Sequence, residues 1–193
     1  MANPSEIAQS WLLKFSSAVA AGSVSEVLAC LHPHGYLRNV FAWQFAIRSL
    51  SGHGEITSFL NEVNIPSLTS FELETDANKS SWTPQTFQSS PPMPVTDKPG
   101  VLASFSFRIA SPTSASSTLA IGRGLVRLIQ SNGGDYTATT LLLKMEDFAG
   151  FEERQDYIAP SHSLPWRLGT LEERIAAKEA VFLQTPDVLI GKN

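Results

Sequence analysis

Residues 118–148 read TLAIGRGLVRLIQSNGGDYTATTLLLKMEDF, and this stretch predicts a long β-hairpin. Apolar and polar residues alternate on both sides of a turn, and the Asn-Gly-Gly of residues 132–134 supplies the positive φ angles that a reversal needs. Gly122 and Gly124 lie in the middle of the first strand, where glycine usually marks a bulge or a sharp bend. We therefore expect the hairpin to belong to a strongly curved sheet.

Two more strands precede the hairpin, and a long loop separates them. Residues 101–110 (VLASFSFRIA) alternate in polarity, which is typical of a half-buried antiparallel strand, and residues 70–75 (SFELET) predict the strand before it. The apolar face of the longer strand carries Phe105 and Phe107. The loop at 82–100 is too long and too rich in proline for a tight hairpin, so we expect a lid or a disordered segment.

Three helical patterns come before the strands. The first begins at a capping Asn3 and ends at Gly22, and the second begins at Ser23 and ends at the HPHG of residues 32–35. The third covers residues 54–63 (GEITSFLNEV). Helices followed by antiparallel strands indicate an α+β fold, in which the helices cover one face of the sheet. Curvature then turns that face into a cone, and its apolar interior is the default position for a ligand pocket.

The composition excludes several classes of protein. The chain has 193 residues, of which 42% are hydrophobic and 17% charged, with a formal net charge of -4 and no adjacent basic residues, so we expect no nucleic-acid partner. Its single cysteine, Cys30, excludes an internal disulfide and fits a buried thiol in a reducing compartment. No apolar run approaches the length that crosses a bilayer, so we expect a cytoplasmic protein without a membrane partner.

Two stretches resemble a known family. HPHGYLRNVFAWQFAIRSLSGHGEITSFL (residues 32–60) and GRGLVRLIQSNGGDYTATTLLLKMEDFAGFEE (residues 122–153) resemble the NTF2-like (SnoaL-like) domain that precedes the flavin domain of fungal and bacterial flavin-dependent monooxygenases. The resemblance extends over about residues 5–190. It implies an NTF2-like cone: a curved antiparallel sheet, three N-terminal helices that cover it, and a C-terminal helix.

The same resemblance divides the chain into two parts. Residues 1–159 are the expected pocket domain, and residues 160–193 are a linker-like segment with a helix at 170–184. The stretch TPDVLI (residues 185–190) resembles the first strand of the flavin domain, but no glycine-rich loop follows it. Gly122-Arg123-Gly124 lies inside a strand and lacks a third glycine, so we expect no flavin or nicotinamide cofactor. We interpret the chain as a stand-alone relative; the alternative is a piece of a larger flavoprotein.

The chain departs from the family pattern where an acid is expected. Asn39 and Gln44 stand where that family commonly has aspartate. Amides donate and accept hydrogen bonds but cannot take up a proton near neutral pH. We therefore expect binding and polarisation of a substrate, with a rate that is flat between about pH 6 and 8 because arginine and tyrosine do not titrate there.

Candidate site residues follow from alternation and from residue type. Arg48 and Tyr36 are the predicted catalytic residues, because a guanidinium or a phenol can polarise a carbonyl. We place Arg48 on one strand face with Gln44, opposite Trp43; the alternative for Arg48 is an ion pair at the rim. The predicted substrate-binding residues are Trp43, Gln44, Asn39, Phe105, Phe107, Arg123, Leu143 and Met145.

Two sets of these residues have alternative interpretations. Arg123 contacts the ligand or forms a buried pair if its strand is regular, and it faces solvent if Gly122 or Gly124 shifts the register. His32 and His34 favour a helix-ending turn over metal ligation or general-base chemistry, because no third ligand stands at a familiar spacing. We expect no metal.

Two functions remain. The first is a cofactor-free cyclase or isomerase, including a pericyclase that catalyses a cycloaddition, acting on a hydrophobic intermediate of fungal secondary metabolism. Holding the reactive ends of the substrate in position lowers the activation free energy of such reactions by about 7 to 11 kcal/mol. The second is a non-catalytic module of a flavin monooxygenase that dimerises or binds substrate. The expected partner is thus a small hydrophobic molecule, and the fold allows a homodimer.

Overall fold

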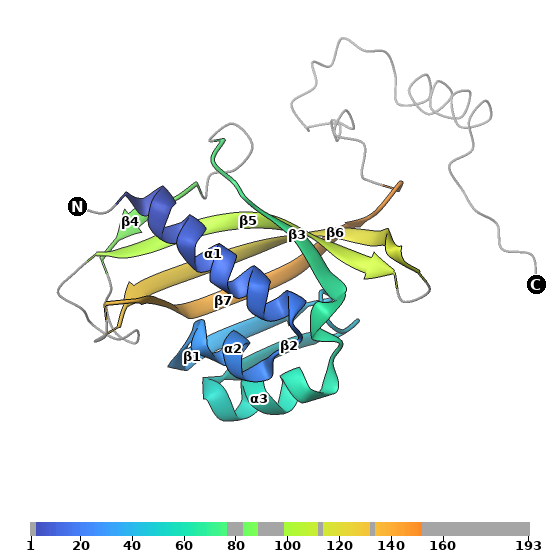
Figure 1. Ribbon diagram of the computed structural model, residues 1–193, viewed down its shortest axis with the longest axis horizontal. Helices are drawn as coiled ribbons and strands as arrows, with labels where there is room; N and C mark the ends of the chain where they lie inside the picture. The colour runs from blue at the N-terminus through green and yellow to red at the C-terminus, as the bar shows by residue number, and fades with distance from the viewer. Residues whose placement is uncertain (1–2, 77–82, 89–98, 112–113, 132–133, 152–193) are drawn as a thin grey trace, which may run out of the picture. The chain divides into compact units, whose positions relative to one another are not determined.

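A single curved sheet carries three helices on one face (Figure 1). The computed structural model describes residues 3–76, 83–88, 99–111, 114–131 and 134–151. The strands in these ranges are β1 (Leu31–Val40), β2 (Ile47–Ser51), β3 (Leu68–Leu73), β4 (Gln85–Phe87), β5 (Gly100–Ser111), β6 (Ser114–Gln130) and β7 (Tyr136–Phe148). They pair in the order β2-β1-β7-β6-β5-β3, and β4 adds to β5.

Two helices begin after the capping residues that the sequence predicts, and the third begins two residues before its predicted start at residue 54. Helix α1 (Pro4–Ala20) follows Asn3, whose side chain accepts a hydrogen bond from the Ser5 amide, and α2 (Val24–Ala29) follows Ser23, which accepts from the Glu26 amide. Helix α3 spans Gly52–Glu62, and a short 3-10 helix η1 spans Ile65–Ser67. In Figure 1, α1 runs across the sheet while α2 and α3 lie beside β1 and β2.

The predicted α+β class and the long hairpin of β6 and β7 are confirmed, whereas the purely antiparallel sheet is not. Strand β1 pairs with β7 in parallel, so the sheet is mixed. The expectation that HPHG ends the second helix is wrong, because α2 ends at Ala29 and residues 32–35 belong to β1. The register of β1 against β7 shifts between Leu31 and Tyr36, which accommodates Pro33, a residue without an amide hydrogen to donate.

The predicted curvature comes with two register shifts in β6. They lie between Ile121 and Gly122 and between Arg127 and Leu128, in its pairing with β7. Within the long loop at 82–100, Gln85–Phe87 form a strand, which corrects the expectation of a lid or disorder for that part. The predicted helix at 170–184 and the predicted boundary at residue 159 lie outside the described residues.

Aromatic rings fill the interior of the cone at its centre. Trp11 and Phe15 of α1 stack with ring centroids 5.0 Å apart, and the Phe15 ring lies 6.4 Å from that of Phe105. The Phe105 and Phe107 rings in turn lie directly over glycines of β6: a Cβ atom at Gly124 would lie 2.1 Å from Phe105, and one at Gly122 would lie 2.5 Å from Phe107. The expected central pocket is therefore occupied by the core.

The cysteine lies in this core, as predicted. Cys30 is a buried free thiol, and its carbonyl oxygen accepts a hydrogen bond of 2.9 Å from Trp11 Nε1. Burial raises the pKa of the thiol to about 11, so it is protonated at neutral pH and a poor nucleophile. Among the described ranges, no helix is both long and apolar enough to span a bilayer.

Candidate functional site

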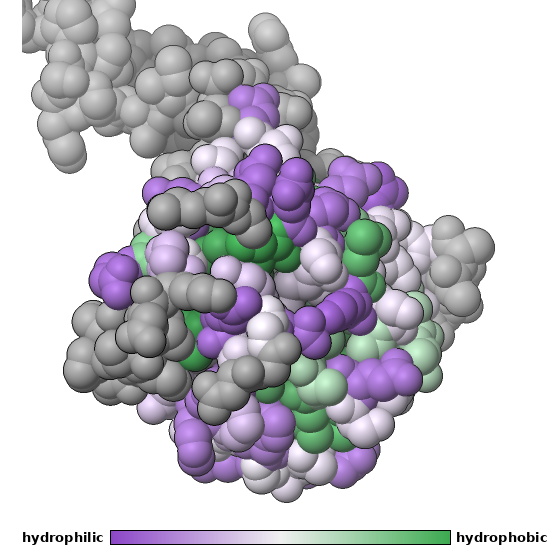
Figure 2. All heavy atoms as spheres, turned by 60° about the vertical axis from the view of Figure 1, so that its left-hand side comes forward, coloured by the Kyte–Doolittle hydropathy of each residue, from purple (hydrophilic) through white to green (hydrophobic). Residues whose placement is uncertain are grey.

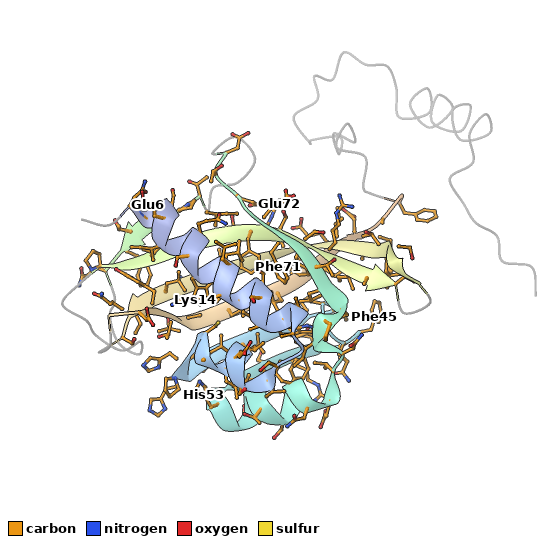
Figure 3. All side chains as sticks on the ribbon, in the orientation of Figure 1. Glu6, Lys14, Phe45, His53, Phe71 and Glu72 are labelled. Carbon is orange, nitrogen blue, oxygen red and sulfur yellow. The ribbon has the colours of Figure 1, made fainter. Side chains whose placement is uncertain are left out.

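A cavity of about 510 Å³ remains at the rim of the sheet, beyond the aromatic core. The loop between β1 and β2, the segment around η1 and the ends of β5, β6 and β7 surround it. Its apolar wall includes Phe41, Phe45, Ile109, Leu119, Met145 and Phe148. Figure 3 shows Phe45 beside the start of β3, at this end of the molecule. We refer to this space as the rim cavity.

The rim cavity concentrates exposed apolar side chains. Phe45 is 73% exposed, and Phe148 and Leu119 are also exposed. Figure 2 brings forward the left-hand side of Figure 1, away from Phe45, and on that face apolar atoms lie between many polar side chains. Large apolar groups that line a concave site and stay in contact with water are typical of a ligand-binding position.

Asn39 holds the loop of residues 41–46, which forms one side of the rim cavity and which we call the lip loop. Its side chain is 0% exposed, and its Nδ2 donates to the carbonyl oxygens of Gln44 at 3.0 Å and Ala46 at 2.8 Å. Its Oδ1 accepts a hydrogen bond of 2.9 Å from the Trp43 amide. This site needs two donors and one acceptor, which an amide supplies and a carboxylate does not. These hydrogen bonds therefore explain why an amide is present at position 39, where the resemblance leads one to expect an acid.

The same loop presents two phenylalanine rings. Phe41 has a φ of 60°, in the left-handed region that few residues other than glycine adopt, and its amide donates to the Ala46 carbonyl at 3.4 Å. The Phe41 and Phe45 rings lie 4.8 Å apart between centroids, tilted by 31°. The bonds to Asn39 stabilise this uncommon backbone conformation and so place both rings at the rim cavity.

Trp43 connects the loop to the core beneath it. Its Nε1 donates to the Ile65 carbonyl of η1 at 3.1 Å, and its ring lies 6.4 Å from that of Phe15 and 6.3 Å from that of Phe59. Trp43 also lines the rim cavity. Trp43 thus fixes the position of the lip loop relative to η1, and both segments line the rim cavity.

Of the predicted substrate-binding residues, Trp43 and Met145 line the rim cavity. Phe105, Phe107 and Leu143 are buried in the core. The side chain of Gln44 is exposed and does not line the cavity, although its backbone carbonyl accepts from Asn39. The predicted strand through residues 43–48 is a loop up to Ala46, so the alternation on which these placements relied does not apply there.

The two predicted catalytic residues lie away from the rim cavity. Tyr36 is 54% exposed, and because its neighbour Leu37 is buried, it points to the other face of β1. Arg48 pairs in register with Asn39, and its exposed side chain has no hydrogen bond or ion pair with the described residues. Neither residue lines the cavity. Their catalytic role stays a prediction that this geometry does not support.

Arg123 forms an ion-pair cluster on the sheet face opposite the helices. Its Nε lies 2.9 Å from Glu74 Oε1, and its Nη1 lies 3.5 Å from Glu146 Oε1. Ser104 Oγ donates to Glu74 Oε2 at 2.7 Å. The neighbours of Arg123 along β6, Gly122 and Gly124, face the aromatic core. Arg123 therefore points to the outer face of the sheet, although the pattern around it is apolar.

No ionisable side chain is found among the described residues that line the rim cavity. His32 and His34 lie at the start of β1, with ring centroids 5.9 Å apart, and neither contributes to the lining. Burial, with smaller contributions from His34 and His53, lowers the pKa of His32, which keeps this imidazole neutral. Within the described ranges, no group of three potential ligands is arranged to hold a metal ion.

Several lining residues are absent from the sequence-based prediction. They are Phe41, Ala42, Phe45, Asn64, Pro66, Ser67, Ile109, Ala110, Ser111, Leu119 and Phe148. The phenylalanines at 41 and 45 flank Trp43 in the segment VFAWQF, and three aromatic residues in five positions form a signal that predicts a binding surface as readily as a strand. Ser67, in a proline-containing turn, carries no such signal.

Comparison with solved structures shows that the fold is similar to that of a ketosteroid isomerase-like protein and of two other proteins. A ketosteroid isomerase-like protein from Erwinia carotovora atroseptica matches with a TM-score of 0.52 and 10% identity, over 75% of this chain and 98% of that one. ActVI-ORFA from Streptomyces coelicolor matches with a TM-score of 0.50 and 8% identity, over 73% and 96% of the two chains. A domain of unknown function with a cystatin-like fold from Nostoc punctiforme matches with a TM-score of 0.50 and 14% identity, over 93% and 86%.

These similarities concern the fold alone, because the identities are low. No family model matches the sequence. No curated protein matches it either. The function therefore rests on the rim cavity itself.

Proposed function

We propose that the protein binds a neutral, largely apolar small molecule in the rim cavity and acts on it as a cofactor-free isomerase or cyclase. One observation carries the proposal: the cavity measures about 510 Å³, has aromatic and aliphatic walls, and has no ionisable side chain among its described lining residues. Ligand pockets commonly measure roughly 300 to 1,000 Å³ and have mostly apolar walls. A charged ligand would lose its hydration without gaining a partner here.

Chemistry in such a site relies on shape. Confinement that holds two reactive ends in contact lowers the activation free energy by about 7 to 11 kcal/mol. Neither a cyclisation by cycloaddition nor a comparable isomerisation requires a titrating side chain. A flat, conjugated substrate suits the mutually tilted Phe41 and Phe45 rings, because aromatic groups favour offset or tilted packing. A hydrophobic intermediate of secondary metabolism is the substrate class that we propose.

The second candidate is a non-catalytic module, and the same neutral lining favours it. Such a module would bind substrate for a flavin monooxygenase or dimerise with it, in line with the resemblance of residues 32–60 and 122–153 to the N-terminal domain of those enzymes. The two candidates differ in what happens to the ligand. A cofactor-free isomerase or cyclase conserves every atom of its substrate, so its product has the same mass.

Mass spectrometry of the molecules that co-purify with the protein separates these candidates. We expect a neutral organic molecule, accompanied after incubation by an isomer of equal mass and a different chromatographic retention time. Recovery of a single unchanged species after prolonged incubation would favour the binding module. Stoichiometric recovery of a charged metabolite would contradict both candidates.

Binding to the rim cavity can be measured with the neutral fluorophore 1-N-phenylnaphthylamine. We expect a saturable rise in emission whose dissociation constant is unchanged between about pH 6 and 8, because neither the dye nor the described lining residues titrate there. Phe45→Ser should weaken binding by about fivefold to tenfold through the lost ring contact. Its melting temperature should stay close to that of the wild type, since Phe45 is largely exposed.

The matched control is Leu13→Ser, which removes an exposed apolar side chain of α1 that does not line the rim cavity. This variant should bind the fluorophore like the wild type. A binding constant that changes with an apparent pKa between 6 and 8 would place a titrating group in the site and overturn the neutral-pocket proposal. Equal weakening by the two serine variants would show that the dye binds elsewhere.

A further inference from the structure

The wall of the rim cavity contains a buried hydroxyl without a partner. Among the described residues, two buried side-chain oxygens, Ser67 Oγ and Thr137 Oγ1, expose less than 1 Å² and form no hydrogen bond. Such groups are rare in folded proteins, and each costs about 1 to 3 kcal/mol when unsatisfied. Ser67 lines the rim cavity, whereas Thr137 is not among its lining residues. The two hydroxyls are thus alike in burial, but only Ser67 Oγ belongs to a residue that lines the rim cavity.

The backbone around Ser67 is already engaged. The Ser67 amide donates to the Asn64 carbonyl at 3.1 Å, and the Ile65 carbonyl accepts from Trp43 Nε1 at 3.1 Å. Ile65 is itself buried in the core. These contacts hold η1 in place and do not involve the Ser67 hydroxyl. Because Oγ exposes less than 1 Å², it meets a ligand in the cavity only after χ1 rotates to another staggered rotamer, which leaves the backbone in place.

We propose that Ser67 Oγ donates a hydrogen bond to a carbonyl oxygen of the ligand and so determines which apolar molecules the rim cavity accepts. This inference rests on the proposed function and adds the polar group of the substrate class: a conjugated or cyclic ketone or related carbonyl compound. A hydrogen bond among apolar walls is stronger than one in water, and a ligand that lacks the carbonyl leaves the hydroxyl unpaired. Ser67 is a specificity-determining residue in this proposal.

The test compares two neutral probes of nearly equal shape. These are 2-acetylnaphthalene, which has a carbonyl, and 2-isopropenylnaphthalene, in which a methylene group replaces the carbonyl oxygen. Each probe displaces 1-N-phenylnaphthylamine from the wild-type protein and from Ser67→Ala. We expect the ratio of the two affinities, ketone over alkene, to fall by about fivefold to tenfold in Ser67→Ala. The affinity for the alkene should change little.

Three further variants make the comparison specific. Thr137→Val removes the other orphan hydroxyl and should leave the affinity ratio unchanged. Ser67→Thr keeps a hydroxyl and should retain the ketone preference, whereas Ser67→Cys, with a weak donor, should lose most of it. The cysteine variant also tests the inference if Ser67→Ala does not fold.

The outcomes separate the two levels of the argument. If both probes bind and the ratio is unchanged by Ser67→Ala or Ser67→Cys, the inference is overturned and the proposed function stands. An equal fall in Thr137→Val would trace the effect to a general change in the fold and would also overturn the inference. If neither probe nor the fluorophore binds the wild-type protein, the proposed function fails and the inference fails with it.

Discussion

Asn39→Asp lowers the free energy of unfolding by about 3 to 5 kcal/mol, the largest effect that we expect from a change of so few atoms. The amide nitrogen of Asn39 lies 2.8 Å and 3.0 Å from two carbonyl oxygens, and the side chain is fully buried. An oxygen in its place cannot donate to both carbonyls. A carboxylate there would be a buried charge that faces two partial negative charges. Denaturant unfolding at pH 7 measures the difference.

The pH dependence of this variant gives a second measurement. The introduced carboxyl lacks solvent and faces carbonyl oxygens, so its pKa in the folded state should rise above the ordinary value of about 4. The folded variant then holds its proton more tightly than the unfolded chain does. Its stability relative to the wild type should therefore increase as the pH falls from about 8 toward 4.

The control for the stability of Asn39→Asp is Asn64→Asp, at an asparagine that lines the rim cavity and whose side chain is exposed. Surface substitutions of this kind change stability by about 0.5 kcal/mol or less. Similar losses in the two variants, or a loss at position 39 that does not depend on pH, would contradict the role that we assign to Asn39. The Asn39 variant that remains folded should also bind 1-N-phenylnaphthylamine more weakly, because its lip loop loses the two hydrogen bonds that the amide nitrogen donates.

The second large effect concerns Gly124→Ala, which should lower the free energy of unfolding by about 3 kcal/mol. The added methyl group would lie 2.1 Å from Cζ of Phe105, well inside van der Waals contact. Phe105 cannot move aside freely, because its ring packs against those of Trp11, Phe71 and Phe107 at centroid distances of 6.0 to 6.3 Å. Strain therefore spreads into the aromatic core.

Two variants test whether the ring contact is the cause. Gly54→Ala is the matched control, because a Cβ at this position of α3 meets nothing within 4 Å; it should be neutral or stabilise the protein by up to about 1 kcal/mol. Phe105→Leu in the Gly124→Ala background removes the clashing ring atoms. The double variant should lose at least about 1 kcal/mol less than the sum of the two single losses. Additive losses would show that the ring at position 105 is not what excludes a side chain at position 124.

Much of the fold is predictable from local patterns. Alternation in residues 101–110 and 118–148 predicts β5, β6 and β7, and the capping residues Asn3 and Ser23 predict where two helices begin. The parallel pairing of β1 with β7 is not predictable in this way, because a strand's own sequence does not specify the direction of its partner. Residues 32–35 (HPHG), at the start of β1, predict a turn because they contain a proline and a glycine, yet they belong to a strand.

The candidate site was harder to predict than the fold. The pattern in residues 43–48 predicts a strand with Arg48 on its binding face, yet residues 41–46 form a loop, which the buried Asn39 holds by donating two hydrogen bonds and accepting one. These bonds join groups four to seven residues apart, and no periodic pattern reports them. The prediction that Tyr36 and Arg48 are catalytic rests on residue type, which indicates what a side chain can do and not where it lies.

Local patterns alone predict the three helices, the long curved hairpin and the apolar face of β5, because these depend on the period of polarity along the chain. Where space remains depends on the tertiary structure. Gly122 and Gly124 suggest bends when taken alone, but in the folded protein they also make room for Phe107 and Phe105, whose rings fill the centre of the cone. The rim cavity lies away from this centre, because a cavity depends on how side chains from distant segments meet, and periodicity describes one strand or helix at a time.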